Sequence, residues 1–464
     1  MSTASIALDL APVPAGQLEE LAGPVHTPAP VSRQERITTV DTLRGFALLG
    51  ILVMNITSFG LPGWNYMIPL TTVHPVFSGP HWRINTIAWF LRWILAEGKM
   101  RALFSMLFGA GAILLTSRAE VRGAADRTAD IFTRRNMWLM LFGALHCYLI
   151  WYGDILFFYG LMGLLFLYPL RKLNPKPLFW TAAIVLVLNG VVGLGGQVGS
   201  AISTRNKAIA ADKLYRAGKP LTEEQSADIR AWHDRQERWR PSQKKLETDL
   251  KAMKGGYLSA QGNDAKEAFE SETVGAYLGF GDVLGFMLLG MGLYRNGFLT
   301  GKFSVKIYAT TAILCLGVSW PLIFASCWFA WKSHFDFFTS ALWLFAPYDI
   351  GRFTGAVGNA AVVLLLLKTG TLKFLTRRLA AVGQMALSNY LFTSSFCKLL
   401  FVWGPLHWYG YMEYYKLYYV VASVWAFNLI WSPIWLLHFQ FGPAEWVWRS
   451  LTYWKRQPMR IPTA

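Results

Sequence analysis

Charged residues are scarce in this chain. Asp, Glu, Lys and Arg make up 15% of its 464 residues, whereas 54% are hydrophobic. A soluble globular domain carries about a quarter charged residues, so the composition argues against that class. Apolar runs that can cross roughly 30 Å of hydrocarbon recur along the chain, and none shows the two-residue alternation of a barrel strand. The sequence therefore predicts an all-α polytopic integral membrane protein, because a helix satisfies its own backbone groups in lipid.

Signatures of metal and nucleotide binding are also missing. The only cysteines, Cys147, Cys315, Cys327 and Cys397, lie in or beside apolar runs and form no C-x-x-C pair. We interpret them as packing residues and expect no metal, since no H-x-x-x-H or E-x-x-H spacing occurs either. Neither G-x-G-x-x-G after a strand nor G-x-x-x-x-G-K-[ST] is present.

Basic residues outnumber acidic ones, with a formal net charge of +17 and a pI near 9.7. Nucleic acid is an unsuitable partner, because these residues are dispersed among the loops between apolar runs. Lys and Arg collect on the cytoplasmic side of membrane proteins. Alternate loops carry them, which predicts that both termini are cytoplasmic.

We expect about ten transmembrane helices. The predicted spans are 44–62, 102–117, 136–152, 154–170, 177–200, 274–294, 307–331, 350–367, 381–403 and 417–440. The alternation of basic loops requires that the segment His81 to Glu97 does not cross the membrane. Arg83 and Arg92 interrupt its apolar positions. We expect there an outer interfacial or re-entrant helix.

These spans divide the chain into five parts. The predicted parts are a disordered cytoplasmic tail (1–36), an N-terminal transmembrane bundle (37–200), an outer helical loop (201–273), a C-terminal transmembrane bundle (274–457) and a short tail (458–464). The outer loop nearly balances its charges, which favours a small helical cap.

The first span begins with an acid and a base, Asp41 and Arg44, and contains one amide, Asn55. An acid at a helix start favours the helix dipole and can pair with a base one turn later. This pair is either a cap with an arginine that reaches the interface, or a site where the arginine binds the phosphates of a donor. Gly45 and Gly50 would let a helix or ligand approach closely.

A second pattern joins His146, near the end of one apolar run, to Asp154 at the start of the next. An imidazole in an apolar span is costly without a partner, and an acid that orients it creates the arrangement of a general base. The alternative is that Asp154 caps its helix while His146 is only a core residue.

Other candidates stand alone. His74 and His81 lie in the outer segment and could act as a base there, although loop histidines are usually solvated. Asp282 interrupts an apolar run and should face the bundle interior or water. Asn389, with Gln384 and Ser388 nearby, could line a substrate pathway or hydrogen-bond between helices.

Five stretches together resemble the YeiB-like family of bacterial inner-membrane proteins. They are VDTLRGFALLGILVMNI, GKMRALFSMLFGAG, LHCYLIWYGDILFFYGLMGL, VGQMALSNYLFTS and FGPAEWVWRSLTYW, and the resemblance runs from about Arg36 to Lys455. That family is similar to a superfamily of transmembrane acyltransferases that includes heparan-alpha-glucosaminide N-acetyltransferase, whose VDTFRG motif resembles VDTLRG here. The resemblance implies a bacterial inner-membrane location.

The sugar acyltransferases of that superfamily have a histidine eleven residues after the arginine, whereas this chain has Asn55. The resemblance therefore leaves the base to His146, His81 or His74. His146 is preferred because it matches the GxxH…GDIL pattern, with Asp154 orienting it, Asn55 positioning the substrate, and Arg44 with Asp41 at the phosphates of the donor.

The activity implied is transfer of an acyl group from cytoplasmic acyl-CoA, acetyl-CoA above all, to a hydroxyl or amine acceptor outside, either a small molecule or a glycan. The alternative is a small-molecule transporter in which Asp282, Asp154 and Arg44 are pathway charges. The sequence leaves the oligomeric state open, with a homodimer as one option.

Overall fold

The computed structural model describes residues 38–121, 125–270 and 276–461. The described chain is helical throughout and has no β-strand, only one isolated bridge between Phe439 and Arg460. The predicted all-α fold class is therefore confirmed. The expected tail 1–36, Arg122, the 273/274 boundary and the last three residues lie outside the described residues.

The helices follow one another along the chain, with a long connection over residues 61–81 between the first two. Their bounds are α2 Thr38–Gly60, α3 Trp82–Leu95, α4 Lys99–Val121, α5 Ala125–Leu149, α6 Leu156–Met162, α7 Tyr168–Leu170, α8 Pro175–Arg216, α9 Glu223–Trp239, α10 Gln243–Lys254, α11 Tyr257–Glu270, α12 Ala276–Arg295, α13 Val305–Lys332, α14 Phe337–Ser340, α15 Tyr348–Thr369, α16 Lys373–Gln384, α17 Ala386–Lys398, α18 Leu417–His438 and α19 Pro443–Tyr453.

Six elements of the described chain are long and apolar enough to cross a membrane. They are Thr38–Gly60, Trp82–Val121, Pro175–Arg216, Val305–Lys332, Phe337–Thr369 and Tyr414–His438. A seventh results if α16 and the extended α17, bent by 84° at their break, count as one span. The expected count of about ten is not confirmed; the apolar helix Leu156–Leu170, for example, is shorter than a full span.

The segment expected to lie in the interface forms α3, which joins α4 in one candidate span. Its apolar residues Ile87 and Leu91 are exposed, whereas Trp89, Arg92 and Trp93 are buried. Arg92 Nη2 lies 2.7 Å from Glu97 Oε2, so this arginine is paired inside the protein. A paired arginine does not have to reach the membrane surface. The expectation that this segment is interfacial or re-entrant stays a prediction.

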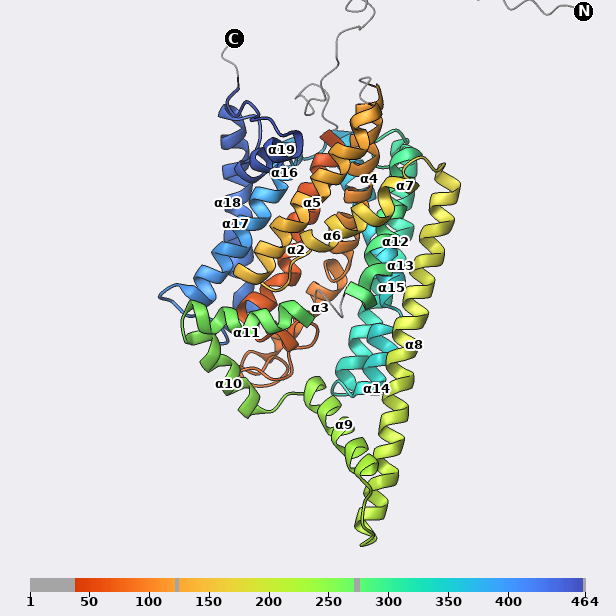
Figure 1. Ribbon diagram of the computed structural model, residues 1–464, viewed down its shortest axis with the longest axis vertical. Coiled ribbons are helices and arrows are strands. Elements are labelled where there is room, and N and C mark those ends of the chain that lie inside the picture. The colour runs from red at the N-terminus through yellow and green to blue at the C-terminus, as the bar shows by residue number, and fades with distance from the viewer. Residues whose placement is uncertain (1–37, 122–124, 271–275, 462–464) are drawn as a thin grey trace, which may run out of the picture.

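The long helices run roughly parallel, and the two ends of the bundle differ (Figure 1). The beginning of α2 and helix α19 lie at one end, called here the terminal end. Helices α9, α10 and α11 lie at the other, the distal end. Helix α8 extends beyond the bundle and pairs with α9 there. The predicted helical loop at 201–273 thus corresponds to the second half of α8 and to α9–α11.

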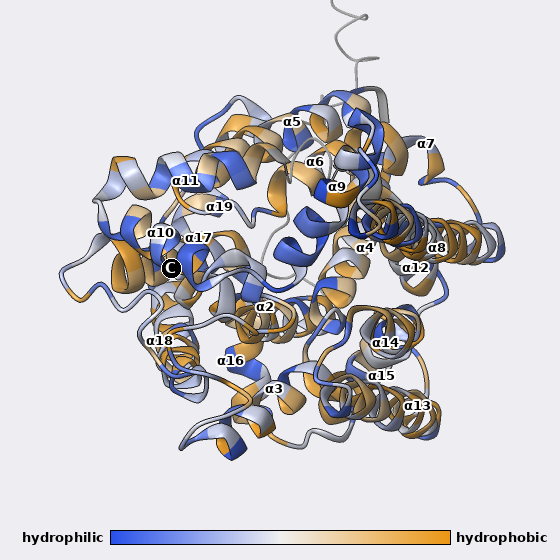
Figure 2. Ribbon diagram, turned by 90° about the horizontal axis from the view of Figure 1, so that it is seen from below, coloured by the Kyte–Doolittle hydropathy of each residue, from blue (hydrophilic) through white to orange (hydrophobic). Residues whose placement is uncertain are grey.

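The outer surface of the bundle is apolar. Figure 2 shows α8 and α13 largely in the hydrophobic colour. Val187, Val191 and Val192 on α8 are each more than 60% exposed, as are Ile313 and Leu314 on α13. A soluble protein rarely leaves such rows uncovered, so these surfaces suit contact with lipid.

Two glycines bring α2 and α16 into backbone contact. A Cβ on Gly45 would lie 2.0 Å from the carbonyl oxygen of Leu379, and one on Gly383 would lie 1.9 Å from that of Asp41. The sequence predicts a close approach at Gly45, and the structure confirms it. Only glycine fits where two helix backbones meet this closely.

We expect Gly383→Ala to destabilise the protein by about 1–3 kcal/mol, because its methyl group would push against backbone that cannot rotate away. Gly317→Ala is the matched control, since a Cβ at Gly317 in α13 meets nothing within 4 Å. Thermal unfolding of the two variants in detergent measures the difference. Equal melting temperatures would contradict the role of this contact.

Candidate functional site

A cavity of about 220 Å³ lies among α2, α4, α5, α6, α17 and α19. Its terminal end is lined by charged side chains from four helices. They are Asp41, Arg44, Arg118, Arg135, Glu445 and Arg449. Deeper inside, aliphatic and aromatic side chains replace them, among them Phe104, Phe108, Leu139, Tyr159 and Tyr390.

The cavity is elongated along α4. Both Arg118 and Phe104 line it, and the 14 helical positions between them correspond to about 21 Å at 1.5 Å per residue. A ligand of matching shape would place a charged end among the arginines and an uncharged end in the bundle. This division of polar and apolar walls is typical of small-molecule sites.

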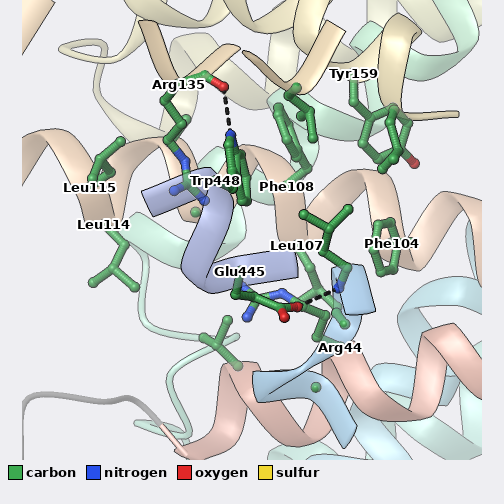
Figure 3. A pocket seen from close by; sticks show the side chains of 18 of the residues that line it. Arg44, Phe104, Leu107, Phe108, Leu114, Leu115, Arg135, Tyr159, Glu445 and Trp448 are labelled. Carbon is green, nitrogen blue, oxygen red and sulfur yellow. Dashed lines mark hydrogen bonds between the residues drawn. The ribbon is translucent and has the colours of Figure 1, made fainter. Parts of the chain in front are cut away.

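Cations outnumber anions at the terminal end, since four arginines face two carboxylates. Asp41 Oδ1 accepts a hydrogen bond from Arg44 Nη1 at 2.8 Å. The guanidinium of Arg135 stacks 3.6 Å from the Trp448 ring centroid, and the Trp448 indole donates to the Arg135 carbonyl oxygen (Figure 3). Burial lowers the pKa of Arg449, opposed in part by Tyr453 and Glu445. A bound anion would favour the charged form of these arginines.

Glu445 holds the break between α16 and α17 in place. Its Oε1 accepts hydrogen bonds from the backbone N–H groups of Leu387 (2.6 Å) and Ser388 (3.2 Å), and its Oε2 accepts from the Ser388 hydroxyl (2.5 Å). In return, the Ser388 hydroxyl accepts from the Ala444 N–H. The carboxylate thereby caps the first turn of α17 and takes the place of an external anion there.

The structure brings His146 and Asp154 together near the distal side of the cavity. His146 Nδ1 lies 2.9 Å from Asp154 Oδ1, and both side chains are at most 1% exposed. Asp154 Oδ2 also accepts a hydrogen bond from the Phe157 N–H at 2.8 Å, so Asp154 both caps α6 and pairs with the imidazole. The contact with His146 and the cap on α6, which the sequence offered as alternatives, therefore occur together. The role of His146 as a base stays a prediction. Neither ring nitrogen of His146 makes an aligned hydrogen bond within the described chain, so its contact with Asp154 is an ion-pair contact.

Tyr390 connects this pair to the cavity. Its hydroxyl lies 3.5 Å from Asp154 Oδ1, and its ring centroid lies 4.9 Å from that of His146. Tyr390 lines the cavity, whereas His146 and Asp154 do not. Tyr390 is therefore a cavity-lining residue that contacts both members of the buried pair.

The remaining candidates from the first segments of the chain lie elsewhere. Asn55 is half-buried on α2, and its carbonyl oxygen accepts a hydrogen bond from Ser58. His81 lies at the beginning of α3, with Nδ1 2.6 Å from Glu413 Oε2 and its side chain 55% exposed. His74 is exposed. None of the three lines the cavity.

Asp282 belongs to a separate charged cluster. Its Oδ1 lies 2.6 Å from Arg352 Nη2, and its Oδ2 lies 3.5 Å from Arg101 Nη2. Asp349 Oδ1 approaches the same Arg352 nitrogen at 2.6 Å. The cluster joins α4, α12 and α15 at about the middle of the bundle, so Asp282 faces other charges, as its place in an apolar run predicts.

Asn389 lies between helices. Its side chain donates to the Ser432 hydroxyl at 2.9 Å and to the Val382 carbonyl oxygen at 3.2 Å, and the residue is 1% exposed. These contacts join α17 to α18 and to the end of α16. The arrangement matches the alternative in which Asn389 hydrogen-bonds between helices.

Sequence reasoning did not single out several residues of the cavity. Arg118, Arg135, Arg449, Glu445 and Tyr390 were not among the candidates from the sequence. Glu445, Arg449 and Tyr390 lie in two of the five recognised stretches, FGPAEWVWRSLTYW and VGQMALSNYLFTS. The available signal was a carboxylate followed by Trp446 and Trp448, because such a group needs a buried partner.

Comparisons with known proteins agree with the resemblance to the YeiB-like family. Residues 293–455 match the family described as "Protein of unknown function (DUF418)". The chain is 28% identical to the uncharacterized protein YeiB of Escherichia coli, over 90% of this chain and 96% of YeiB. It is 27% identical to the uncharacterized protein YxaH of Bacillus subtilis, over 94% and 98% respectively. No solved structure matches the chain.

We expect Glu445→Gln to destabilise the protein by about 2–3 kcal/mol, because an amide accepts fewer hydrogen bonds from α17 and leaves the neighbouring arginines without a counter-charge. Glu223→Gln is the control, since Glu223 is exposed in the first turn of α9. Thermal unfolding in detergent gives the comparison. A melting temperature equal to that of the control would contradict the assigned capping role.

Proposed function

We propose that this chain is a membrane-embedded acyltransferase that moves an acyl group from acyl-CoA, most simply acetyl-CoA, to a hydroxyl or amine acceptor. The observation that supports this proposal is the cavity itself. Arginines surround one end of it, and Tyr390, which contacts the buried His146 and Asp154, lines the other. The superfamily resemblance of VDTLRG supplies the reaction class.

The donor would enter from the terminal end. Its phosphates would contact Arg44, Arg135 and Arg449, because guanidinium groups bind phosphate by paired hydrogen bonds. Its pantetheine arm would follow the apolar walls toward Tyr159 and Tyr390. The binding of a charged group at one end and an uncharged arm at the other fixes the position of the thioester.

The chemistry forms one bond and breaks one. The acceptor oxygen or nitrogen attacks the thioester carbon, its proton passes through the Tyr390 hydroxyl to the His146–Asp154 pair, and the C–S bond breaks. The thiolate leaves as the thiol after it takes up that proton. In this scheme His146 is the base and Asp154 orients it. Asn55 and His81, which the sequence also offered for these roles, lie outside the cavity and take no part in this scheme.

The proposed topology places the terminal end in the cytoplasm of a bacterial cell and the distal end outside the inner membrane. The concentration of Lys and Arg in alternate loops, which predicts cytoplasmic termini, gives this orientation. Acyl-CoA would then be reached from the cytoplasm, and a small-molecule or glycan acceptor from the outer side. The single cavity would serve a reaction whose two substrates arrive from opposite sides.

We expect His146→Gln to abolish hydrolysis of acetyl-CoA by the purified protein while acetyl-CoA still binds. The amide keeps the approximate size of the ring but cannot take up a proton. Isothermal titration gives binding, and release of free thiol gives turnover. His233→Gln is the matched control, because that side chain on α9 is 76% exposed.

Arg449→Gln should weaken acetyl-CoA binding by about tenfold or more, because it removes a charged contact to phosphate. Arg456→Gln is the control, since Arg456 is exposed and does not line the cavity. If isothermal titration of the wild-type protein shows no heat of binding with any acyl-CoA, the proposal is wrong. Full turnover in His146→Gln would reject only the assigned base.

A transporter is the second candidate, favoured by the cluster of Arg101, Asp282, Asp349 and Arg352. Ionisable groups inside a membrane often mark a substrate or proton pathway. Asp349 and Arg101 are each more than one third exposed. If transport is the function, Asp282→Asn should abolish proton-coupled uptake into proteoliposomes and leave acetyl-CoA binding intact. Uptake that persists in this variant would count against it.

A further inference from the structure

A second hollow lies at the distal end, between helix α9, the distal half of α8 and the turn that joins α13 to α14. Three arginines line it, Arg205 from α8 and Arg235 and Arg240 from α9. Its volume of about 840 Å³ accommodates a ligand larger than a single ion. This hollow is separate from the cavity near Tyr390.

Aromatic rings form its wall and hold the arginines. The guanidinium of Arg205 lies 5.2 Å from the Phe338 ring centroid, and that of Arg235 lies 5.7 Å from that of Phe337. Trp232 stacks against Phe338 with an interplanar angle of 15°. These contacts restrict the long arginine side chains, which reduces the entropy lost when they bind a ligand.

In the part of the chain that the structure describes, no ion pair involves any of these three arginines, although the hollow also contains Glu237 and Asp336. Glu237 accepts a hydrogen bond from the Ser242 N–H at 2.8 Å, and Asp336 accepts one from the Thr339 N–H at 2.9 Å. Each carboxylate thus fixes the start of a following helix and keeps its negative charge, and Asp336 also interacts electrostatically with Arg205. Because three arginines face two carboxylates, the hollow keeps a net positive charge.

The backbone of the turn is held in an uncommon conformation. His334 and Phe335 have φ angles of 53° and 57°. Arg240 donates to the His334 carbonyl oxygen at 2.7 Å, and the Trp239 indole donates to that of Phe335 at 3.0 Å. Two consecutive non-glycine residues with positive φ angles cost free energy, so the surrounding contacts must hold them in place. The hydrogen bonds from Trp239 and Arg240 do so, and they fix α9 against the turn.

The level of the hollow in the membrane indicates what reaches it. The turn follows Trp328 and Trp331 of α13 and precedes Trp343, and these tryptophans are exposed or half-buried. Tryptophans concentrate at the depth of lipid headgroups. A ligand in the hollow can therefore be attached to a lipid whose chains remain in the bilayer.

We propose that this distal hollow binds a phosphate-bearing ligand through Arg205, Arg235 and Arg240. A phosphate group suits it because guanidinium groups bind phosphate in a paired geometry and the aromatic wall can contact the attached organic group. The phosphate can belong to a lipid headgroup or to a soluble phosphate compound. The site holds this ligand whether or not the chain transfers acyl groups.

The test uses the full chain purified in detergent, with Arg205→Gln as the principal variant. Arg205 makes no hydrogen bond to another described residue, so this change should leave the fold intact. Arg230→Gln is the matched control, since Arg230 lies on α9, is exposed and does not line the hollow. The probes are phosphatidylglycerol and phosphatidylcholine, followed by native mass spectrometry, and pyrophosphate, followed by isothermal titration.

We expect one phosphatidylglycerol molecule fewer to be retained by Arg205→Gln than by the wild type or Arg230→Gln, with retention of phosphatidylcholine unchanged. A lipid-headgroup site gives this result without pyrophosphate binding. A site for soluble phosphate compounds instead gives pyrophosphate binding that weakens about tenfold in Arg205→Gln. If the wild type and Arg205→Gln behave alike with both probes, or if the wild type binds neither, the proposal is overturned.

Discussion

The contact between α2 and α16 at Gly45 and Gly383 is the constraint on which the candidate site depends. Because the two backbones meet there, Asp41 and Arg44 lie beside the break that follows α16. The break turns the chain by 84° and directs the start of α17 toward the same region. A side chain at either glycine would separate the helices and with them the walls of the cavity.

Buried charge is the second constraint, and the bundle satisfies it with partners distant in the sequence. Glu445 compensates the start of α17, Asp282 pairs with Arg352, and Asp264 of α11 pairs with Lys398 of α17. Each such group would be costly without its partner. The pairs therefore fix how the helices are arranged, because moving one helix would leave a buried charge alone.

These two constraints together determine where the groups of the proposed reaction lie. The arginines remain at the terminal end, where water can reach them, and the imidazole of His146 lies in an almost dry environment. Tyr390 stands between the two regions and contacts both. Burial explains why the histidine needs Asp154, since an imidazolium in a region of low dielectric requires a nearby negative charge.

The sequence by itself determined the all-α membrane class, the pairing of Asp41 with Arg44 three positions later, and the close approach at Gly45. Composition and local spacing decide these features, since the interactions are short-range or depend on the total of apolar residues. It also identified His146 and Asp154 as potential partners, because only one turn separates their helices. The expected count of about ten spans is not confirmed, because an apolar run does not reveal how a helix bends or continues.

Only the tertiary structure decided which distant residues share a site. Arg135, Tyr390 and Glu445 come from helices that are far apart in the chain, and their meeting depends on how α2, α5, α17 and α19 pack. It also placed Asn55, His81 and Asn389 outside the cavity, although their residue types suited a site equally well. The sequence gives the chemical type of each side chain. Which side chains meet in one cavity depends on how the helices pack.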